Sequence, residues 1–454
     1  MSDLARMIRR RNKQASPAGD ASVPCSNGLV NTNLPPEAEA ARQTAALSLI
    51  EPAGRRAVAV FLGRDDYEKV ADAYGNTMAR LLMGSLPALV KELGGYAVMA
   101  EMFNPHCGDP LNPVQTTVEV AGRLYPILTS GHLFLYLPED RVVVSAERLD
   151  PGVNVITVRS GRDSAAFFKM WRAFTRKHNY LRGRAFFADG QIIERKRAYT
   201  WDDIVISDEV RRTIETHVEG FLRNREQLRQ LGLKARRGLI LEGPPGTGKT
   251  LLGKVLADTL GASFMWVSPR HIDGPAAFEE ILQVARFVTP TVVFLEDLDL
   301  FAEDRDVRGG MALGELMNQL DGALGNEDII TIATTNRLEI IEKALRNRPG
   351  RFDRVLNIGK MDAPCRHRML ARLLVKAVVS ADDIAHLVSV TDGYTGAQIE
   401  ELANTLYILA VNRHDDASGD GDGKPAVVID RPLIAAALEE FRVELKARVG
   451  FHAA

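Results

Sequence analysis

The chain has 454 residues, with 46% hydrophobic and 26% charged residues, as expected for a folded protein with more than one domain. A formal charge of -2 excludes the general attraction to nucleic acid or anionic membranes that a strongly basic protein has. The cysteines Cys25, Cys107 and Cys365 form no C-x-x-C pair. We therefore expect no disulfide framework, no zinc knuckle and a reducing, cytoplasmic location, and we predict no metal site at His106 beside Cys107.

The first part of the chain is predicted to be a tail followed by a helix. Residues 1–54 are rich in small and polar residues and are expected to form a flexible tail. A helix is predicted from Asp65 to Leu93, in which Val70 and Tyr74 are among the apolar residues at helical spacing. The best apolar candidate for a membrane span, Leu81 to Val90, is too short to cross a bilayer, so no transmembrane segment is expected.

A series of strands follows. Apolar and β-branched residues predict strands at 116–128, 132–137, 141–149 and 154–160, with turn signals at Ser130-Gly131 and at 138–140. A second helix is predicted at 163–177. These elements predict an α+β domain over residues 55–199. It has no phosphate loop, acid pair or nucleophile motif, so a recognition or positioning role is expected.

After residue 199, strands alternate with helices. The apolar runs RGLILEG, SFMWVS, TVVFLED, IITIATTN and RVLNIGK predict five strands with helical stretches between them. Nearly continuous apolar strands separated by helices are typical of a parallel sheet covered on both faces. We therefore predict an α/β nucleotide-binding domain with a parallel five-stranded sheet over residues 200–361, and a helical domain over 362–454.

A phosphate-binding loop is predicted between the first of these strands and its helix. The residues Gly243, Pro244, Pro245, Gly246, Thr247, Gly248, Lys249 and Thr250 match G-x-x-x-x-G-K-[ST]. Glycines let backbone N–H groups turn toward phosphates, and the following helix N-terminus favours negative charge. Lys249 is expected to neutralise the β- and γ-phosphates of ATP, and the Thr250 hydroxyl to help hold Mg²⁺.

Carboxylates follow the strand at Thr291 to Leu295. Glu296, Asp297 and Asp299 lie where catalytic groups gather in an open parallel sheet, at the carboxyl end of a strand. One acid can bind the Mg²⁺ shell while its neighbour polarises the attacking water. The alternative is a polar strand end that only faces solvent.

The chain resembles the AAA family of the AAA+ superfamily from about Thr200 to the C-terminus. The motifs that carry this resemblance are Trp201–Ile204, Gly243–Thr250, Glu296-Asp297, Ala333–Asn336, Arg348–Arg354 and Tyr394–Ala397. The resemblance implies a P-loop AAA+ module whose C-terminal helical domain, 362–454, is the lid. It also implies a homo-oligomeric ring, a hexamer or heptamer, that hydrolyses ATP with Mg²⁺ at subunit interfaces.

The resemblance also implies roles for single residues. Asn336 matches the residue that orients the hydrolytic water, and Arg351 and Arg354 match arginine fingers that reach the γ-phosphate in the next subunit. Glu296 takes the metal position and Asp297 the water-polarising position. The remaining nucleotide contacts implied are Ile204 and Val205 at the adenine, Leu251 after the loop, and Gly396 and Ala397 in the lid. The alternative for Arg351 and Arg354 is a surface pair that caps the turn at Asp353.

Two positions depart from the usual AAA pattern. Most members have Asp then Glu where this chain has Glu296 then Asp297, which makes slower turnover plausible on chemical grounds. Ile272 stands where threading motors carry a pore-loop aromatic residue, so gripping of an extended polypeptide is not expected. Both departures are shared by the mitochondrial AAA chaperone subgroup that translocates the folded Rieske iron–sulfur subunit. That subgroup has an N-terminal membrane anchor, which is not found here, so a soluble relative is expected.

Three functions remain open from the sequence. The first is an ATP-dependent protein-remodelling or chaperone-like ring, with residues 55–199 binding an unknown client or positioning the ring. The second is a nucleotide-gated scaffold with slow hydrolysis, suggested by the order of the two acids. The third is a nucleic-acid-acting AAA+ loader, for which the basic runs at 176–177, 195–197 and 234–237 are short and lack interleaved aromatic residues. Nucleic acid is therefore not expected as a partner.

Overall fold

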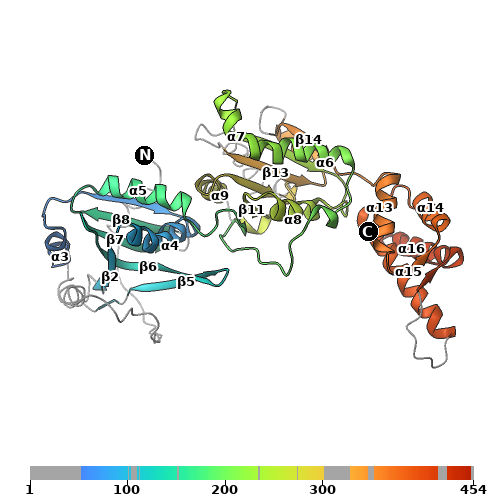
Figure 1. The fold of residues 1–454 in the computed structure, drawn as a ribbon, viewed down its shortest axis with the longest axis horizontal. Helices are drawn as coiled ribbons and strands as arrows, with labels where there is room; N and C mark the ends of the chain where they lie inside the picture. The colour runs from blue at the N-terminus through green and yellow to red at the C-terminus, as the bar shows by residue number, and fades with distance from the viewer. Residues whose placement is uncertain are drawn as a thin grey trace.

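The computed structural model describes residues 53–100, 102–103, 110–111, 113–150, 153–233, 236–272, 275–300, 328–345, 352–417 and 427–450. In these residues, an antiparallel sheet, a parallel sheet and a group of helices follow one another along the chain (Figure 1). The predicted tail lies outside the described residues as far as residue 52. No helix within the described ranges has the length and apolar character needed to cross a membrane.

The first sheet is antiparallel throughout its described pairings. Its strand order is β1-β8-β7-β6-β2, and β5 pairs with β6. The strands are β1 (Lys69–Tyr74), β2 (Tyr96–Ala100), β5 (Val114–Val120), β6 (Arg123–Tyr136), β7 (Arg141–Asp150) and β8 (Val153–Ser160); β3 (Met102–Phe103) and β4 (Pro110–Leu111) form a separate pair.

Helices cover both faces of this sheet. Successive side chains of a strand point to opposite faces, so apolar residues in a row along a strand need a partner on each face. Val142 and Val144 of β7 share a hydrophobic core with α4 (Asn76–Glu92) and α5 (Ser164–Lys177). Val143, between them, packs with residues of α3 (Ala53–Leu62) on the other face. The α+β character expected from the sequence is therefore present in this part of the chain.

Two sequence predictions in this region are wrong. The helix predicted from Asp65 begins only at Asn76, because residues 69–74 form β1, which pairs with β8. The turn predicted at Ser130-Gly131 lies inside β6. Gly131 has a φ of 130°, a conformation that favours glycine, and β6 pairs with β5 up to Ser130 and with β7 from Gly131 onward. The glycine thus marks the change of partner within one long strand.

The second sheet is parallel and carries the nucleotide-binding motifs. Within the described residues it has six strands in the order β14-β10-β13-β12-β11-β9. These are β9 (Ala185–Phe187), β10 (Arg236–Glu242), β11 (Ser263–Val267), β12 (Thr291–Leu295), β13 (Ile329–Thr335) and β14 (Arg354–Asn357). The α/β fold with a parallel sheet is confirmed, and the five strands predicted within residues 200–361 are β10 to β14; β9, from before that range, adds a sixth strand by pairing with β11.

Helices cover both faces of this sheet too. Leu239 and Leu241 of β10 face one core, shared with α6 (Asp208–Ile214), the π-helix η2 (Glu215–Glu219), α7 (Gly220–Gln230) and α8 (Lys249–Thr259). Ile240 faces the other core, shared with α9 (Pro275–Phe287) and α12 (Leu338–Leu345). That second core continues into the helices of the first sheet, so the two sheets share one hydrophobic core.

The C-terminal part is helical and has its own core. It contains α13 (Ala363–Leu373), α14 (Ala381–Val390), α15 (Gly396–Ala417) and α16 (Arg431–Gly450), with a small parallel pair of β15 (Val378–Val379) and β16 (Val428–Ile429). Asp362 caps α13 by accepting from Cys365 N at 2.8 Å. The cap fixes the start of α13 shortly after β14, which ends at Asn357.

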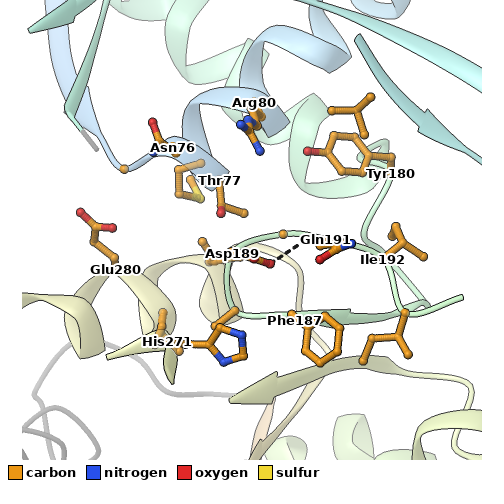
Figure 2. A pocket seen from close by; sticks show the side chains of 18 of the residues that line it. Asn76, Thr77, Arg80, Tyr180, Phe187, Asp189, Gln191, Ile192, His271 and Glu280 are labelled. Atoms are coloured by element: carbon orange, nitrogen blue, oxygen red, sulfur yellow. Dashed lines mark hydrogen bonds between the residues drawn. The ribbon is translucent and has the colours of Figure 1, made fainter. Parts of the chain in front are cut away.

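A cavity of about 1210 Å³ lies between the two sheets. Thr77 and Arg80 of α4 face Asp189 and Gln191 of the loop after β9 across this space (Figure 2). His271, from the short 3-10 helix η3 (Pro269–His271) after β11, lies at the edge of the cavity. The lining is about equally polar and apolar and carries charges of both signs, so no ligand class is favoured by its chemistry.

Candidate nucleotide site

The phosphate loop connects the end of β10 to the start of α8. Gly246 and Gly248 have φ values of 78° and 98°, which a side chain would strain. A Cβ on Gly243 would lie 2.2 Å from the carbonyl oxygen of Ile358. The loop is further tied down by Thr247, whose hydroxyl donates to Pro244 O at 3.0 Å. These constraints explain why the loop needs glycines and give it a defined shape.

Lys249 is the first residue of α8 and its side chain is buried. Its ammonium group donates to Gly243 O at 2.6 Å and to Pro244 O at 2.9 Å. Burial lowers the pKa of Lys249, while the nearby charge of Asp297 acts in the opposite direction. The loop therefore holds one cation close to the backbone that is expected to surround phosphates.

The two acids after β12 are held by different partners. Asp297 has a φ of 52°, and its backbone N–H donates to the Thr334 hydroxyl at 2.9 Å. Burial, followed by the charges of Glu296 and Asp299, raises the pKa of Asp297. Its carboxylate lines the same cavity as Lys249. A partly buried carboxylate beside a phosphate loop is suited to polarise a water molecule.

Glu296 faces the phosphate loop. Its Oε1 accepts from the Thr250 hydroxyl at 2.8 Å, and its Oε2 accepts from the indole Nε1 of Trp266 at 3.0 Å. A hydroxyl and a carboxylate oxygen are hard oxygen ligands of the kind that Mg²⁺ takes together with phosphate oxygens and water. No group of three or more His, Cys, Asp and Glu ligands occurs among the described residues. The donors present thus fit a magnesium ion that is held jointly with phosphates.

A cavity of about 530 Å³ joins most of the predicted site residues. Its lining includes Ile204, Val205, Pro245, Gly246, Thr247, Gly248, Lys249, Thr250, Leu251, Asp297, Asn336, Gly396 and Ala397. Segments far apart in sequence are joined directly here, since Ala397 N donates to Gly246 O at 3.0 Å. Gly243, Pro244 and Glu296 are not part of the lining but contact Lys249 or Thr250.

Of the two predicted arginine fingers, Arg354 does not line this cavity. Arg354 is exposed at the start of β14, where it pairs in register with Leu239 in the middle of β10; the phosphate loop follows the end of β10 at Glu242. Arg351 lies outside the described residues.

Asp299 is a residue to which the sequence analysis assigned no role of its own. Its carboxylate is 2% exposed and accepts from the Thr335 hydroxyl at 2.9 Å and from Asn336 N at 3.2 Å. Asp299 therefore fixes the backbone that carries Asn336 into the cavity. In the sequence, Asp299 is marked only as a third acid, two positions after Asp297. The fold is needed to show that it contacts the turn at Thr335 and Asn336.

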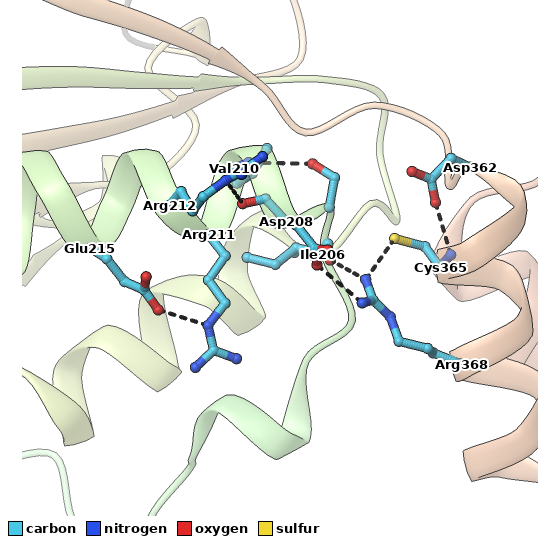
Figure 3. Close-up of polar contacts among 10 residues, drawn as sticks. Ile206, Asp208, Val210, Arg211, Arg212, Glu215, Asp362, Cys365 and Arg368 are labelled. Carbon is cyan, nitrogen blue, oxygen red and sulfur yellow. Dashed lines mark hydrogen bonds and ion pairs between the residues drawn. The ribbon is translucent and has the colours of Figure 1, made fainter.

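Residues of α13 were also missed. Arg368 donates to Ile206 O at 2.8 Å, to Asp208 Oδ1 at 3.1 Å and to Cys365 Sγ at 3.2 Å (Figure 3). Arg372, which lines the nucleotide cavity, donates to Asp202 O at 2.9 Å. The two arginines thus bind the chain on both sides of Ile204 and Val205. The charge pattern of α13 could not indicate these backbone acceptors.

We expect Arg368→Ala to weaken ATP binding about 2- to 5-fold, because an exposed ion pair contributes up to about 1 kcal/mol. The reason is that the segment carrying Ile204 and Val205 loses an anchor. Titration with a fluorescent ATP analogue measures the change. Arg413→Ala is the matched control, since Arg413 pairs with Asp430 at 2.9 Å within the C-terminal helices. Equal affinities in both variants would contradict the role of Arg368.

The class of domain follows from this geometry. A parallel sheet, a glycine-rich loop ahead of a helix, a buried lysine and acids at the end of a neighbouring strand define a P-loop nucleotide-binding domain. Residues 239–360 match the family model described as "ATPase family associated with various cellular activities (AAA)". The module that contains the site is therefore an AAA ATPase domain.

Curated relatives match about half of the chain. Protein SAV of Sulfolobus acidocaldarius is 33% identical over 258 residues, which is 54% of this chain and 32% of that protein. An ATP-dependent zinc metalloprotease FtsH of Halothermothrix orenii is 34% identical over 237 residues, 49% of this chain and 37% of the relative. Protein CdcH of Halobacterium salinarum is 32% identical over 256 residues, which is 53% of this chain and 34% of that protein. The chain thus spans about a third of the length of these relatives.

Proposed function

We propose that this protein binds Mg²⁺ and ATP in the cavity beside Gly243–Thr250, hydrolyses the ATP, and uses the energy to remodel protein clients as an oligomeric ring. The observation that carries the proposal is the assembly of Lys249, Thr250, Asp297 and Asn336 around one cavity. The match to an AAA ATPase domain supports the hydrolytic activity.

Each residue has a proposed task in this reaction. Lys249 and the loop N–H groups bind and neutralise the phosphates, and Asp297 takes a proton from the attacking water that Asn336 orients. Thr250 and Glu296 would hold Mg²⁺, which offsets charge on the phosphate oxygens. Ile204, Val205, Gly396 and Ala397 would enclose the base and ribose, since they line the same cavity as the phosphate loop.

The ring is supported by the position of Arg354. Since Arg354 is exposed and does not line the nucleotide cavity of its own chain, it is available to serve the site of an adjoining subunit. Arg351, three residues earlier, is proposed for the same role. An arginine supplied in trans makes hydrolysis depend on assembly. Hexameric or heptameric assembly is part of this proposal.

Other features of the proposal concern the rest of the chain. We assign the first sheet and its helices to client binding or ring positioning, with domain limits at 55–199, 200–361 and 362–454. Ile272 and the Glu296-Asp297 order support kinship with the Rieske-translocating subgroup. The cytoplasmic location rests on the widely spaced cysteines. A protease activity is not proposed, because the sequence has no H-E-x-x-H zinc motif.

Phosphate release tests this function. We expect turnover per subunit to rise with protein concentration in parallel with the particle mass measured by light scattering. A mixture of Arg351→Ala and Lys249→Ala subunits should turn over ATP faster than either variant alone. In the mixture, the Arg351→Ala subunit supplies an intact phosphate loop and the Lys249→Ala subunit supplies an intact arginine finger. A monomer that hydrolyses ATP at the full rate would contradict the ring.

A slow, nucleotide-gated scaffold is the second candidate. It is favoured by the order of the acids, because Asp297 is shorter than the glutamate usual at the water-polarising position. The same assay separates the two candidates. Tight ATP binding with assembly, but without measurable phosphate release at any concentration, would support the scaffold.

A further inference from the structure

The carboxylate of Glu296 is held from two sides. Thr250 donates to its Oε1, and Trp266 of β11 donates to its Oε2 through the indole Nε1. The backbone N–H of Glu296 donates to Val267 O at 2.8 Å, so β11 holds this residue by backbone and by side chain. Trp266 is 6% exposed and lies outside the lining of the nucleotide cavity. Its hydrogen bond to Glu296 connects it to the site.

The orientation of the indole is fixed by packing. Its ring centroid lies 4.6 Å from that of Phe294 on β12 and 6.1 Å from that of Phe264 on its own strand. Phe294 in turn packs against α8 at Gly253, where an added Cβ would lie 2.5 Å from the ring. A buried ring that packs against two other rings has little rotational freedom, so its N–H has one direction. That direction is toward Glu296.

We infer that Trp266 is a positioning residue for the magnesium site, whose indole N–H keeps the Glu296 carboxylate turned toward Thr250. The inference rests on the proposed Mg²⁺-dependent function. Glutamate has one more rotatable bond than aspartate, so a glutamate at the metal position needs an additional anchor to keep its carboxylate in place. Hydrogen-bond partners of metal ligands fix ligand orientation and metal affinity in this way.

The experiment compares Trp266→Phe with the unchanged protein. Phenylalanine retains an aromatic ring beside Phe294 but cannot donate to Glu296. We expect the Mg²⁺ concentration for half-maximal ATP turnover to rise roughly 10-fold, as is usual when the partner of a metal ligand is removed. The affinity for ATP in EDTA, measured by isothermal titration calorimetry, should stay unchanged, because the lysine and the loop are intact.

Two further variants separate positioning from a general packing defect. Trp171→Phe removes another buried indole N–H, which donates to Leu82 O at 3.1 Å in the first sheet's core. It should keep the normal Mg²⁺ dependence. Trp266→His restores a ring N–H at the same number of bonds from Cα, and should lower the required Mg²⁺ relative to Trp266→Phe.

Tryptophan emission provides a readout that does not depend on turnover. In a Trp171→Phe, Trp201→Phe protein only Trp266 remains among the 3 tryptophans. Its emission should shift when Mg²⁺ is added to the ATP-loaded protein, because the acceptor carboxylate then shares its charge with the metal. An unchanged Mg²⁺ requirement in Trp266→Phe, or no emission shift on adding Mg²⁺, would overturn the inference. Failure of the unchanged protein to bind ATP would instead overturn the proposed function.

Discussion

Replacing Lys249 by alanine is expected to weaken ATP binding roughly 1,000-fold, because removal of one partner of a buried charge pair costs 2–5 kcal/mol or more. The ammonium group lies against the carbonyls of Gly243 and Pro244, inside the loop that is proposed to enclose the phosphates. No other lysine of the described residues makes such contacts with this loop. Isothermal titration calorimetry with Mg²⁺ and ATP measures the loss.

The control for Lys249 is Lys169→Ala, which removes an exposed lysine from α5. It should bind ATP as tightly as the unchanged protein. Circular dichroism of the Lys249 variant should show an intact fold, so that loss of binding is not loss of structure. An ATP affinity within a few-fold of the unchanged value would refute the assignment of the phosphate site.

Replacing Asp297 by asparagine should leave ATP binding intact and slow turnover roughly 100- to 10,000-fold, the range that positioned acid–base groups contribute. Asparagine has nearly the same shape, and the backbone bond to Thr334 is retained, but the amide cannot accept a proton from water. Single-turnover phosphate release, with binding measured in parallel, distinguishes the two steps. The ATP-bound variant should accumulate as an assembled particle.

The matched control is Asp65→Asn, at an exposed aspartate far from Asp297 in the sequence, which should keep normal turnover.

Because burial and the neighbouring acids raise the pKa of Asp297, the unchanged protein should lose turnover on acidification at a higher pH than an ordinary aspartate would require. This acidic limb should disappear in Asp297→Asn. Normal turnover in Asp297→Asn would transfer the water-polarising role to Glu296 or to another group.

The sequence predicted the parallel sheet and the loop well because their signals are local. A contiguous glycine-rich motif, a strand before it and a helix after it lie within a few residues of one another. Glu296 and Asp297 directly follow an apolar strand, so their place at a sheet edge could be predicted as well. The resemblance assigned Glu296 to the metal position, and only the fold shows that its carboxylate accepts from the Thr250 hydroxyl.

Elements that depend on distant contacts were missed. Val70 and Tyr74 are four residues apart, which places them on one face of a helix and equally on one face of a strand. The choice is made by pairing with β8, more than 70 residues away in the described register. β9 spans only Ala185–Phe187, too short for a periodic pattern, and exists through its pairing with β11.

The supporting residues of the site were missed for the same reason. Trp266 lies in a strand where every residue is buried, so the pattern gives no hint that its N–H has a charged acceptor. Asp299 and Arg372 contact backbone atoms of segments remote in sequence. Every residue except proline offers the same backbone donor and acceptor, so such contacts cannot be recognised from residue types.

An electron cryomicroscopy map of the protein with a non-hydrolysable ATP analogue and Mg²⁺ tests the central claim most directly. The account predicts a triphosphate enclosed by Gly243–Thr250, metal density between Thr250 and Glu296, and an arginine of the adjoining subunit near the γ-phosphate. A saturated particle with nucleotide bound away from this loop, or with no neighbour completing the site, would contradict it.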